Sequence, residues 1–340
     1  MQSPQKVRRL AIHHSFKKIR ETKCFERLRS LLMFENAECV YNSSVSSILS
    51  GGSKLLRVLD LRGASLETFP HEVCELVHLR YLSIRGTHVR YIPASIGKLR
   101  ILETLDLKHN WMIGLPIEIG KLEKLRYLVF NGVTVPAEIG NLSSLQKLAR
   151  IAANQVNGQI ILGVIGKLTQ LKSLKISKLR RKHGMILCPS LKKLSNLRSL
   201  SLSSLPIHEI DIRSLSLSSP PKYEFDFLDL KTLSLGTPFL RKLYLEGHLE
   251  EAPAWISSLH SLVKVRLSSS RLRDDLLTYL QDLPNLQHLE LHDNACKEVE
   301  LCFKAGGFKS LQFLWLEALE KLRWVKFEQG AMPHLENLIV

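Results

Sequence analysis

Residues 79–93 have the sequence LRYLSIRGTHVRYIP, and closely similar stretches lie on both sides of them. The preceding stretch, LRVLDLRGASLETFP, covers 56–70, and the following one, LETLDLKHNWMIGLP, covers 102–116. A leucine recurs every 23 residues at the same place in the pattern, at Leu59, Leu82, Leu105 and Leu128. Prolines keep this step at Pro70, Pro93 and Pro116, and Pro136 follows after 20 residues. The chain is therefore built from repeated units.

The pattern L-x-x-L-x-L at the head of each unit predicts a short β-strand. Its last two leucines are two residues apart, so both side chains point to the same face. One strand cannot bury that face alone, whereas stacked units join their leucines into one core. This pattern at a period of about 20–29 residues is the signature of leucine-rich repeats. We therefore expect an α/β fold, a leucine-rich repeat solenoid or horseshoe of about eleven repeats with a parallel concave β-sheet.

The segments that follow the prolines predict the convex side of the solenoid. PHEVCELVHL, PASIGKLRIL and PIEIGKLEKL carry apolar residues three or four positions apart, which suits short helices or irregular segments. Proline has no backbone N–H and fits after a strand, where the chain turns away. The asparagine typical of this place occurs only at Asn110, whereas Ala64, Thr87 and Val133 stand at the equivalent positions. We expect a less regular coil as a result.

The spacing also predicts the core and the organisation of the chain. Buried positions are expected for Leu59, Leu82, Leu105, Leu128, Leu289 and Leu314, and core packing for Trp111, Trp255 and Trp324. Regular repeats cover 55–148, after irregular basic repeats in 1–54. The period loosens in 149–239, which is basic and contains an insertion, and repeats return in 240–340. We expect one continuous solenoid.

The charge is strongly positive and unevenly spread. The formal net charge is +16, and residues 1–30 hold nine Lys or Arg residues against two Glu residues. From 139 to 208 there are twelve Lys or Arg residues and no acidic residue. Such asymmetry favours an acidic partner surface, and the alternative is a solvated basic face without a partner. Nucleic acid is a disfavoured partner, because stacking aromatic residues are absent from this basic stretch.

Motifs for catalysis and cofactors are missing from the sequence. It contains no G-x-x-x-x-G-K-[ST] loop, no H-E-x-x-H and no G-x-S-x-G, so we expect neither an enzyme nor a cofactor site. His13 and His14 are adjacent and would point to opposite faces of a strand, which makes a poor metal pair. We expect no metal.

The expected location is the cytoplasm. No run of 18 apolar residues exists, the N-terminal segment has no apolar signal core, and membrane contact is not expected. The six cysteines form no C-x-x-C pair, so we interpret them as thiols of a reducing compartment. KLRRKH at 178–183 could serve nuclear import, although a basic loop is the simpler interpretation.

Residues at equivalent concave positions are the candidate protein-binding residues. Arg62, Arg85 and Lys108 are 23 residues apart, so we expect a column of stacked positive charges. An acidic docking surface would complement this column, and the alternative is a solvated face that survives unpaired at small cost. The other candidates on this face are Tyr81, Tyr127, Tyr244, His288, Glu290, Phe313 and Trp315. Exposed aromatic residues favour binding, and the alternative is that a flanking loop covers Phe313 and Trp315.

Several phrases resemble one known family. VRRLAIHH at 7–14 is similar to the start of the repeats in plant intracellular nucleotide-binding leucine-rich repeat (NLR) disease resistance proteins of the coiled-coil type. FLRKLYLEGHLEEAPAWISSLHSL at 239–262 and WVKFEQGAMPHLENL at 324–338 resemble their C-terminal half. The similarity covers nearly the whole chain. The coiled-coil region and nucleotide-binding switch of such receptors are missing, and the chain stops at HLENLIV, on a repeat strand. We expect a receptor fragment, a truncated product or a stand-alone repeat protein, with a final strand prone to association.

The resemblance implies a role in plant innate immunity. Its repeats would recognise a pathogen effector or a guarded host protein. They would also hold a nucleotide-binding module inactive, in cis or on another chain. A constitutive repeat scaffold without an immune role is the alternative. An extracellular receptor ectodomain is disfavoured, because the chain lacks the N-x-L-x-G-x-I-P unit of such proteins.

Overall fold

The computed structural model describes residues 7–12, 26–33, 42–50, 53–204, 230, 237–249, 251–272 and 275–340. The chain divides into two compact units, Met1–Ile151 and Ala152–Val340, called here the N-terminal and the C-terminal unit. Within the described residues the main sheet has fourteen strands, and every pair for which a register is given is parallel. The strand order is β1-β2-β3-β4-β5-β6-β7-β8-β9-β10-β11-β12-β14-β16. The parallel sheet is confirmed, and the expected number of about eleven repeats was too low.

The strands of the N-terminal unit follow the predicted leucines. They are β1 (Arg9–Ile12), β2 (Ser30–Met33), β3 (Val58–Asp60), β4 (Tyr81–Ser83), β5 (Thr104–Asp106), β6 (Tyr127–Val129) and β7 (Lys147–Ala152). Leu59 stands opposite Leu31 on one side and Leu82 on the other. All six leucines predicted to be buried are 0% exposed. The repeat period therefore set the register, because a shift by one residue would expose this face.

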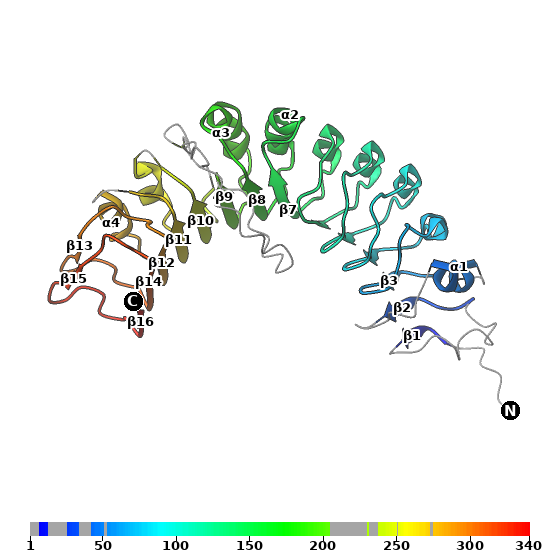
Figure 1. Cartoon of the computed structure of the whole chain (residues 1–340), viewed down its shortest axis with the longest axis horizontal. Helices are drawn as coiled ribbons and strands as arrows, with labels where there is room; N and C mark the ends of the chain where they lie inside the picture. Colours follow the sequence, from blue (N-terminus) through cyan, green and yellow to red (C-terminus); the bar gives the residue numbers. More distant parts are fainter. Residues whose placement is uncertain are drawn as a thin grey trace, which may run out of the picture. The chain divides into compact units, whose positions relative to one another are not determined.

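Short helical turns follow the prolines, as predicted. The 3₁₀ turns are η1 (His71–Glu75), η2 (Ala94–Lys98), η3 (Ile117–Lys121) and η4 (Ala137–Asn141), and α1 (Asn42–Ser50) precedes them. Pro70, Pro93, Pro116 and Pro136 are their N-caps, with extended backbone. The turns lie on one side of the unit and the strands on the other (Figure 1).

Asn110 shows what the typical asparagine does between repeats. Its side-chain amide donates to the carbonyl of Ile84 (2.9 Å), and its Oδ1 accepts from the backbone N–H of Thr87 (2.8 Å). The smaller or apolar side chains of Ala64 and Val133 cannot make both bonds. Only one of the four equivalent positions therefore ties its repeat to the preceding one in this way.

The C-terminal unit has longer strands and larger helical segments. Its main-sheet strands are β8 (Ser173–Ser177), β9 (Ser199–Ser203), β10 (Lys242–Glu246), β11 (Lys264–Ser268), β12 (His288–His292), β14 (Phe313–Glu317) and β16 (Asn337–Ile339). Its helical segments are α2 (Gly158–Val164), η5 (Ile165–Lys167), η6 (Arg181–His183), α3 (Gly184–Lys192), η7 (Ala254–Ser258) and α4 (Asp275–Leu280). We call the side of the sheet that faces away from these segments the open face.

A second, two-stranded sheet was not predicted. β13 (Glu300–Phe303) pairs in parallel with β15 (Trp324–Phe327), on the side of the helical segments (Figure 1). Phe303 and Phe327 stack with ring centroids 5.3 Å apart. Strands replace helical turns here because the segment alternates apolar and polar residues, as a half-buried strand does.

The prediction that the tryptophans pack in the core was wrong for two of them. Trp111 and Trp324 are 68% and 65% exposed. Met112 fills the core beside Trp111 instead, so bulk is supplied by the neighbouring residue. Trp255 is half-buried, and its Nε1 donates to the carbonyl of Leu230 (2.9 Å).

Candidate protein-binding surface

The open face of β10, β11, β12 and β14 brings the five C-terminal candidate residues together. The strands pair without offset, so alternate residues form two rows that run across them. The first row is Lys242, Lys264, His288 and Phe313, and the second row is Tyr244, Arg266, Glu290 and Trp315. We call these eight residues the C-terminal surface.

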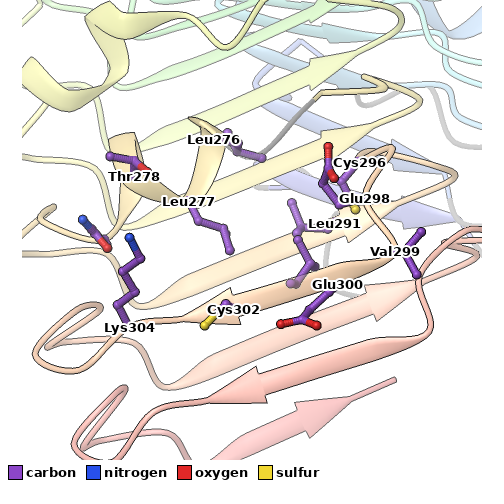
Figure 2. Close-up of a pocket in the computed structure, with 12 residues that line it drawn as sticks. Leu276, Leu277, Thr278, Leu291, Cys296, Glu298, Val299, Glu300, Cys302 and Lys304 are labelled. Carbon is purple, nitrogen blue, oxygen red and sulfur yellow. The ribbon is translucent and has the colours of Figure 1, made fainter.

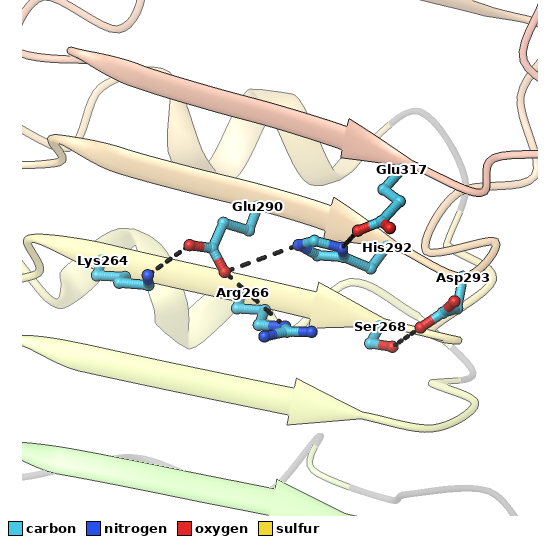
Figure 3. Close-up of polar contacts among 7 residues, drawn as sticks. All are labelled: Lys264, Arg266, Ser268, Glu290, His292, Asp293 and Glu317. Atoms are coloured by element: carbon cyan, nitrogen blue, oxygen red, sulfur yellow. Dashed lines mark hydrogen bonds and ion pairs between the residues drawn. The ribbon is translucent and has the colours of Figure 1, made fainter. Parts of the chain in front are cut away.

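Glu290 is the centre of an ionic network on this surface (Figure 3). One carboxylate oxygen binds the ammonium of Lys264. The other lies 3.8 Å from Nε of Arg266 and 3.7 Å from Nε2 of His292. Glu290 is therefore buried, with 4% exposure, although the sequence pattern presented it as a surface residue. A buried carboxylate needs such partners, because an unpaired charge away from water is costly.

His292 joins this network to the aromatic residues. Its Nδ1 lies 2.9 Å from a carboxylate oxygen of Glu317, and its ring meets the edge of Trp315 with centroids 4.8 Å apart. His292 itself is buried. It therefore packs against Trp315 from the neighbouring strand, whereas Trp315 keeps part of its surface open to solvent.

The aromatic side chains of the first and second rows support one another. Phe313 and Trp315 meet with centroids 6.2 Å apart, and His288 lies 5.6 Å from Phe313. All three residues are half-buried, as is Tyr244 on β10. Such rings supply contact area at a low entropic cost, because their neighbours already hold them in place.

The N-terminal column stacks as predicted, just beyond the ends of β3, β4 and β5. The N–H of Gly63 donates to the carbonyl of Arg85, and the N–H of Gly86 donates to that of Lys108, each at 2.9 Å. Arg62 and Lys108 are half-buried and Arg85 is exposed. The three cations therefore lie on neighbouring turns of the chain.

Arg62 of this column has an acidic partner within the protein. Its Nε and Nη2 donate to Oδ2 of Asp60 at 2.9 and 2.6 Å, and the Asp60 carboxylate is buried. This hydrogen bond raises the pKa of Arg62 above its already high usual value. Since Asp60 neutralises Arg62, the open charges of the column are those of Arg85 and Lys108.

The two N-terminal tyrosines lie in one row with Thr104 between them. Tyr81 on β4 and Tyr127 on β6 both stand opposite that residue of β5. Tyr81 is half-buried, and burial raises the pKa of its phenol, with Asp60 adding to the effect. Tyr127 is 37% exposed, and the guanidinium of Arg126 lies 5.6 Å from its ring centroid. Thr104 separates the two rings, so the row does not form a continuous aromatic patch.

Residues 27–340 match the family described as Leucine-rich repeat region. The chain belongs to the leucine-rich repeat family. Over 106 residues it is 35% identical to Disease resistance protein RPM1 of Arabidopsis thaliana. The match includes 31% of this chain and only 11% of that much longer protein.

Solved leucine-rich repeat structures share the fold. The protein LIC12759 of Leptospira interrogans superposes with a TM-score of 0.64 at 20% identity, over 96% of this chain and 85% of that one. The ectodomain of the Arabidopsis thaliana membrane receptor kinase GASSHO1/SCHENGEN3, solved with CASPARIAN STRIP INTEGRITY FACTOR 2, gives 0.53 at 19% identity. That match covers 93% of this chain and 43% of the receptor chain. At such identities the likeness shows the fold alone.

Sequence reasoning missed four residues of this leucine-rich repeat surface. Lys264, Arg266, His292 and Glu317 line the open face beside the predicted residues. Each lies one or two strand positions from a predicted residue or opposite one in the neighbouring repeat. Aligning the repeats strand by strand would have found them, because facing residues share the same place in L-x-x-L-x-L.

The leucine-rich repeats also enclose a cleft on the side of the helical segments (Figure 2). Its volume is about 490 Å³, and α4 and β13 contribute to its lining. Leu277, Leu291 and Leu301 contribute apolar side chains to the lining, and Cys302 also lines the cleft. Glu300 also lines the cleft, but Lys326 binds its carboxylate at 2.8 Å. The cleft is separate from the C-terminal surface, which faces the other way.

The remaining sequence candidates lie at scattered sites. His13, His14, Cys24 and Cys39 fall outside the described residues. Burial raises the pKa of the Cys74 thiol, which makes it a poor nucleophile at neutral pH. In KLRRKH, His183 is buried, and its Nδ1 accepts from the N–H of Arg180 (3.0 Å).

The described residues contain neither a candidate metal site nor a candidate membrane span. No three of their His, Cys, Asp or Glu side chains gather as a metal site would require. No helix in these parts of the chain has both the length and the apolar character needed to cross a lipid bilayer.

Proposed function

We propose that this leucine-rich repeat protein is a protein-interaction module of plant innate immunity. It would recognise a pathogen effector or a guarded host protein, hold a nucleotide-binding module inactive, or do both. The partial identity to Disease resistance protein RPM1 supports the immune role. Repeat solenoids present extended binding surfaces, which supports recognition without catalysis. We propose the cytoplasm as its location, with nuclear import through residues 178–183 as an addition.

The C-terminal surface is the observation that carries the recognition role. Tyr244, Phe313 and Trp315 offer partly open rings, and the ring of Trp315 packs against those of Phe313 and His292. Arg266 adds an exposed cation between them. Aromatic residues and arginine dominate binding energy in protein interfaces, and rigid anchors lose little entropy on association. This combination fits a folded protein partner with its own apolar pockets and acidic rim.

The first test removes the two aromatic ends of the second row. Changing Tyr244 and Trp315 to alanine should weaken partner binding by about 2 kcal/mol or more, because such anchors are typical hot spots. The measurement is capture of partners from infected plant tissue, followed by calorimetry with the partner identified. Trp111→Ala is the matched control, since Trp111 is an exposed tryptophan of the other unit. Unchanged affinity of the double variant would remove Tyr244 and Trp315 from the site.

The N-terminal column would contact the nucleotide-binding module. Glutamate at Arg62, Arg85 and Lys108, in a receptor that includes the module, should cause signalling without a pathogen. Charge reversal turns attraction to an acidic surface into repulsion, and it also breaks the Arg62–Asp60 pair. The measurements are a cell-death assay in leaves and salt-dependent binding of the isolated repeats to the module.

A matched control makes this second test specific. Arg90, Arg100 and Lys121 are exposed residues of the same unit, and their triple glutamate variant changes the net charge equally. It should remain silent. A silent receptor with normal module binding in the Arg62, Arg85 and Lys108 variant would show that the column is a solvated face.

A constitutive scaffold without an immune role is the second candidate. Family membership supports it equally, because leucine-rich repeats serve many kinds of recognition. Genomic context separates the two candidates. A nucleotide-binding exon directly upstream would favour the immune receptor, and its absence from the transcript would favour the scaffold.

A further inference from the structure

Four arginines form a ladder at the start of the first four strands. Arg8, Arg29, Arg57 and Arg80 each stand directly before a strand, from β1 to β4. The N–H of Arg29 donates to the carbonyl of Arg8, that of Arg57 to Arg29, and that of Arg80 to Arg57. All three hydrogen bonds are 2.8 Å long. The backbones are therefore in contact step by step, and we call these residues the arginine ladder.

The arginine ladder is exposed and largely unneutralised. All four residues are exposed. Arg80 binds the carboxylate of Glu103, the next residue of the same column. Within the described parts of the chain, Arg8, Arg29 and Arg57 have no carboxylate at ion-pair distance. Strands in a sheet are about 4.8 Å apart, so the three steps span about 14 Å. Like charges this close repel one another, which favours a polyanionic partner.

The chemistry of arginine narrows the class of partner. A guanidinium presents a planar fork of N–H donors that matches a carboxylate or a phosphate with two parallel hydrogen bonds. Among the residues that the structure describes, the aromatic residue nearest in sequence to the arginine ladder is Tyr81, which is half-buried. Binding of a single-stranded nucleic acid relies on exposed rings on which bases stack. The carboxylates of a polypeptide are therefore the better match.

We propose that the arginine ladder binds a run of acidic residues in an extended polypeptide segment. The segment would lie across the starts of β1 to β4, with its carboxylates on the guanidinium groups. An extended chain advances about 3.3 Å per residue, so 14 Å corresponds to a run of about four or five Asp or Glu residues, of which alternate ones point to the same side. This inference rests on the proposed recognition role and names the chemistry of a partner that binds away from the C-terminal surface.

The test uses the full chain and labelled peptides. A fluorescein-labelled peptide with five consecutive glutamates is compared with its glutamine counterpart and with a single-stranded RNA oligonucleotide, by fluorescence anisotropy. We expect the glutamate peptide to bind at least about tenfold more tightly than the glutamine peptide, and to weaken as salt is raised. The double variant Arg29→Gln/Arg57→Gln should lose about tenfold in affinity for it.

Two further variants distinguish binding by the arginine ladder from attraction by the positive charge of the unit as a whole. Arg29→Lys/Arg57→Lys keeps the charge but not the fork, so its affinity should fall between those of the glutamine variant and the unaltered chain. Arg90→Gln/Lys121→Gln removes two exposed cations from the same unit and should change the affinity less than about twofold. Circular dichroism of each variant checks that the repeats remain folded.

Three outcomes of these binding measurements would overturn the proposal. Equal binding of the glutamate and glutamine peptides, or equal loss in the Arg90/Lys121 control, would overturn the proposal. Tighter binding of RNA that the same arginine substitutions abolish would overturn it in favour of a nucleic acid. None of these results bears on the recognition role of the C-terminal surface, whose test uses Tyr244 and Trp315 in the other unit.

Discussion

Replacing Leu59 with alanine is expected to lower the free energy of unfolding by about 2–5 kcal/mol. Leu59 is 0% exposed and lies between Leu31 and Leu82 on neighbouring strands. Removing its isobutyl group leaves a cavity that the flanking strands cannot close, because their backbones are held by the sheet hydrogen bonds. Urea denaturation followed by circular dichroism measures the effect as a lower midpoint.

Leu55→Ala is the matched control for this substitution. Leu55 lies four residues earlier in the same unit and is 45% exposed. Its truncation should cost less than about 1 kcal/mol, since surface substitutions away from special features have small effects. Equal effects of the two substitutions would mean that the register of β3 is wrong, and with it the assignment of the open face.

The repeat period predicted the strands because it encodes stacking directly. A leucine that recurs every 23 residues must return to the same place in each turn of the chain, as Leu59, Leu82 and Leu105 do. The prolines predicted the 3₁₀ turns for a similar reason, because the fixed backbone angle of Pro93 or Pro116 suits an N-cap. Both the strands and the 3₁₀ turns therefore depend on one residue type that recurs at a fixed place in each repeat.

The repeat period could not predict the structure of the less regular segments. The side opposite the main sheet has segments of varying length and type, so α3 and β13 follow no common template. Trp111 illustrates the difficulty: one position along the chain decides between the core and solvent, and Met112 takes the buried place. The spacing of irregular repeats does not define a position to within one residue, so it could not decide which of the two side chains is buried.

The sequence predicted which residues lie on the open face, but not which of their charges are paired. The open-face positions follow from the alternation of leucines, so Tyr244, Phe313 and Trp315 were placed correctly. Whether a charge is free depends on cross-strand neighbours about one repeat away. Glu290 is enclosed by Lys264, a contact between residues 26 apart in sequence. The Arg62–Asp60 pair was within reach of the sequence, because the two residues are only two positions apart.

Gly158→Ala is expected to destabilise the C-terminal unit by about 3 kcal/mol. Gly158 is the first residue of α2, and it packs directly on the backbone at Ala153. A methyl group there would overlap the carbonyl oxygen of Ala153 and lie 2.8 Å from its carbonyl carbon. Backbone atoms of this kind cannot move aside as a flexible side chain can, so the start of α2 would have to shift away from the sheet.

Gly163→Ala provides the control within the same helix. A methyl group at Gly163 would meet only Cγ2 of Ile186, at 3.9 Å, which is an ordinary van der Waals contact. Alanine is also the better helix former by up to about 1 kcal/mol, so this variant should be neutral or more stable. Hydrogen exchange of the α2 and β8 amides, together with urea denaturation, compares the two variants. If Gly158→Ala is as stable as Gly163→Ala, then α2 does not rest on the carbonyl of Ala153, and the repeat that begins at β7 is packed differently.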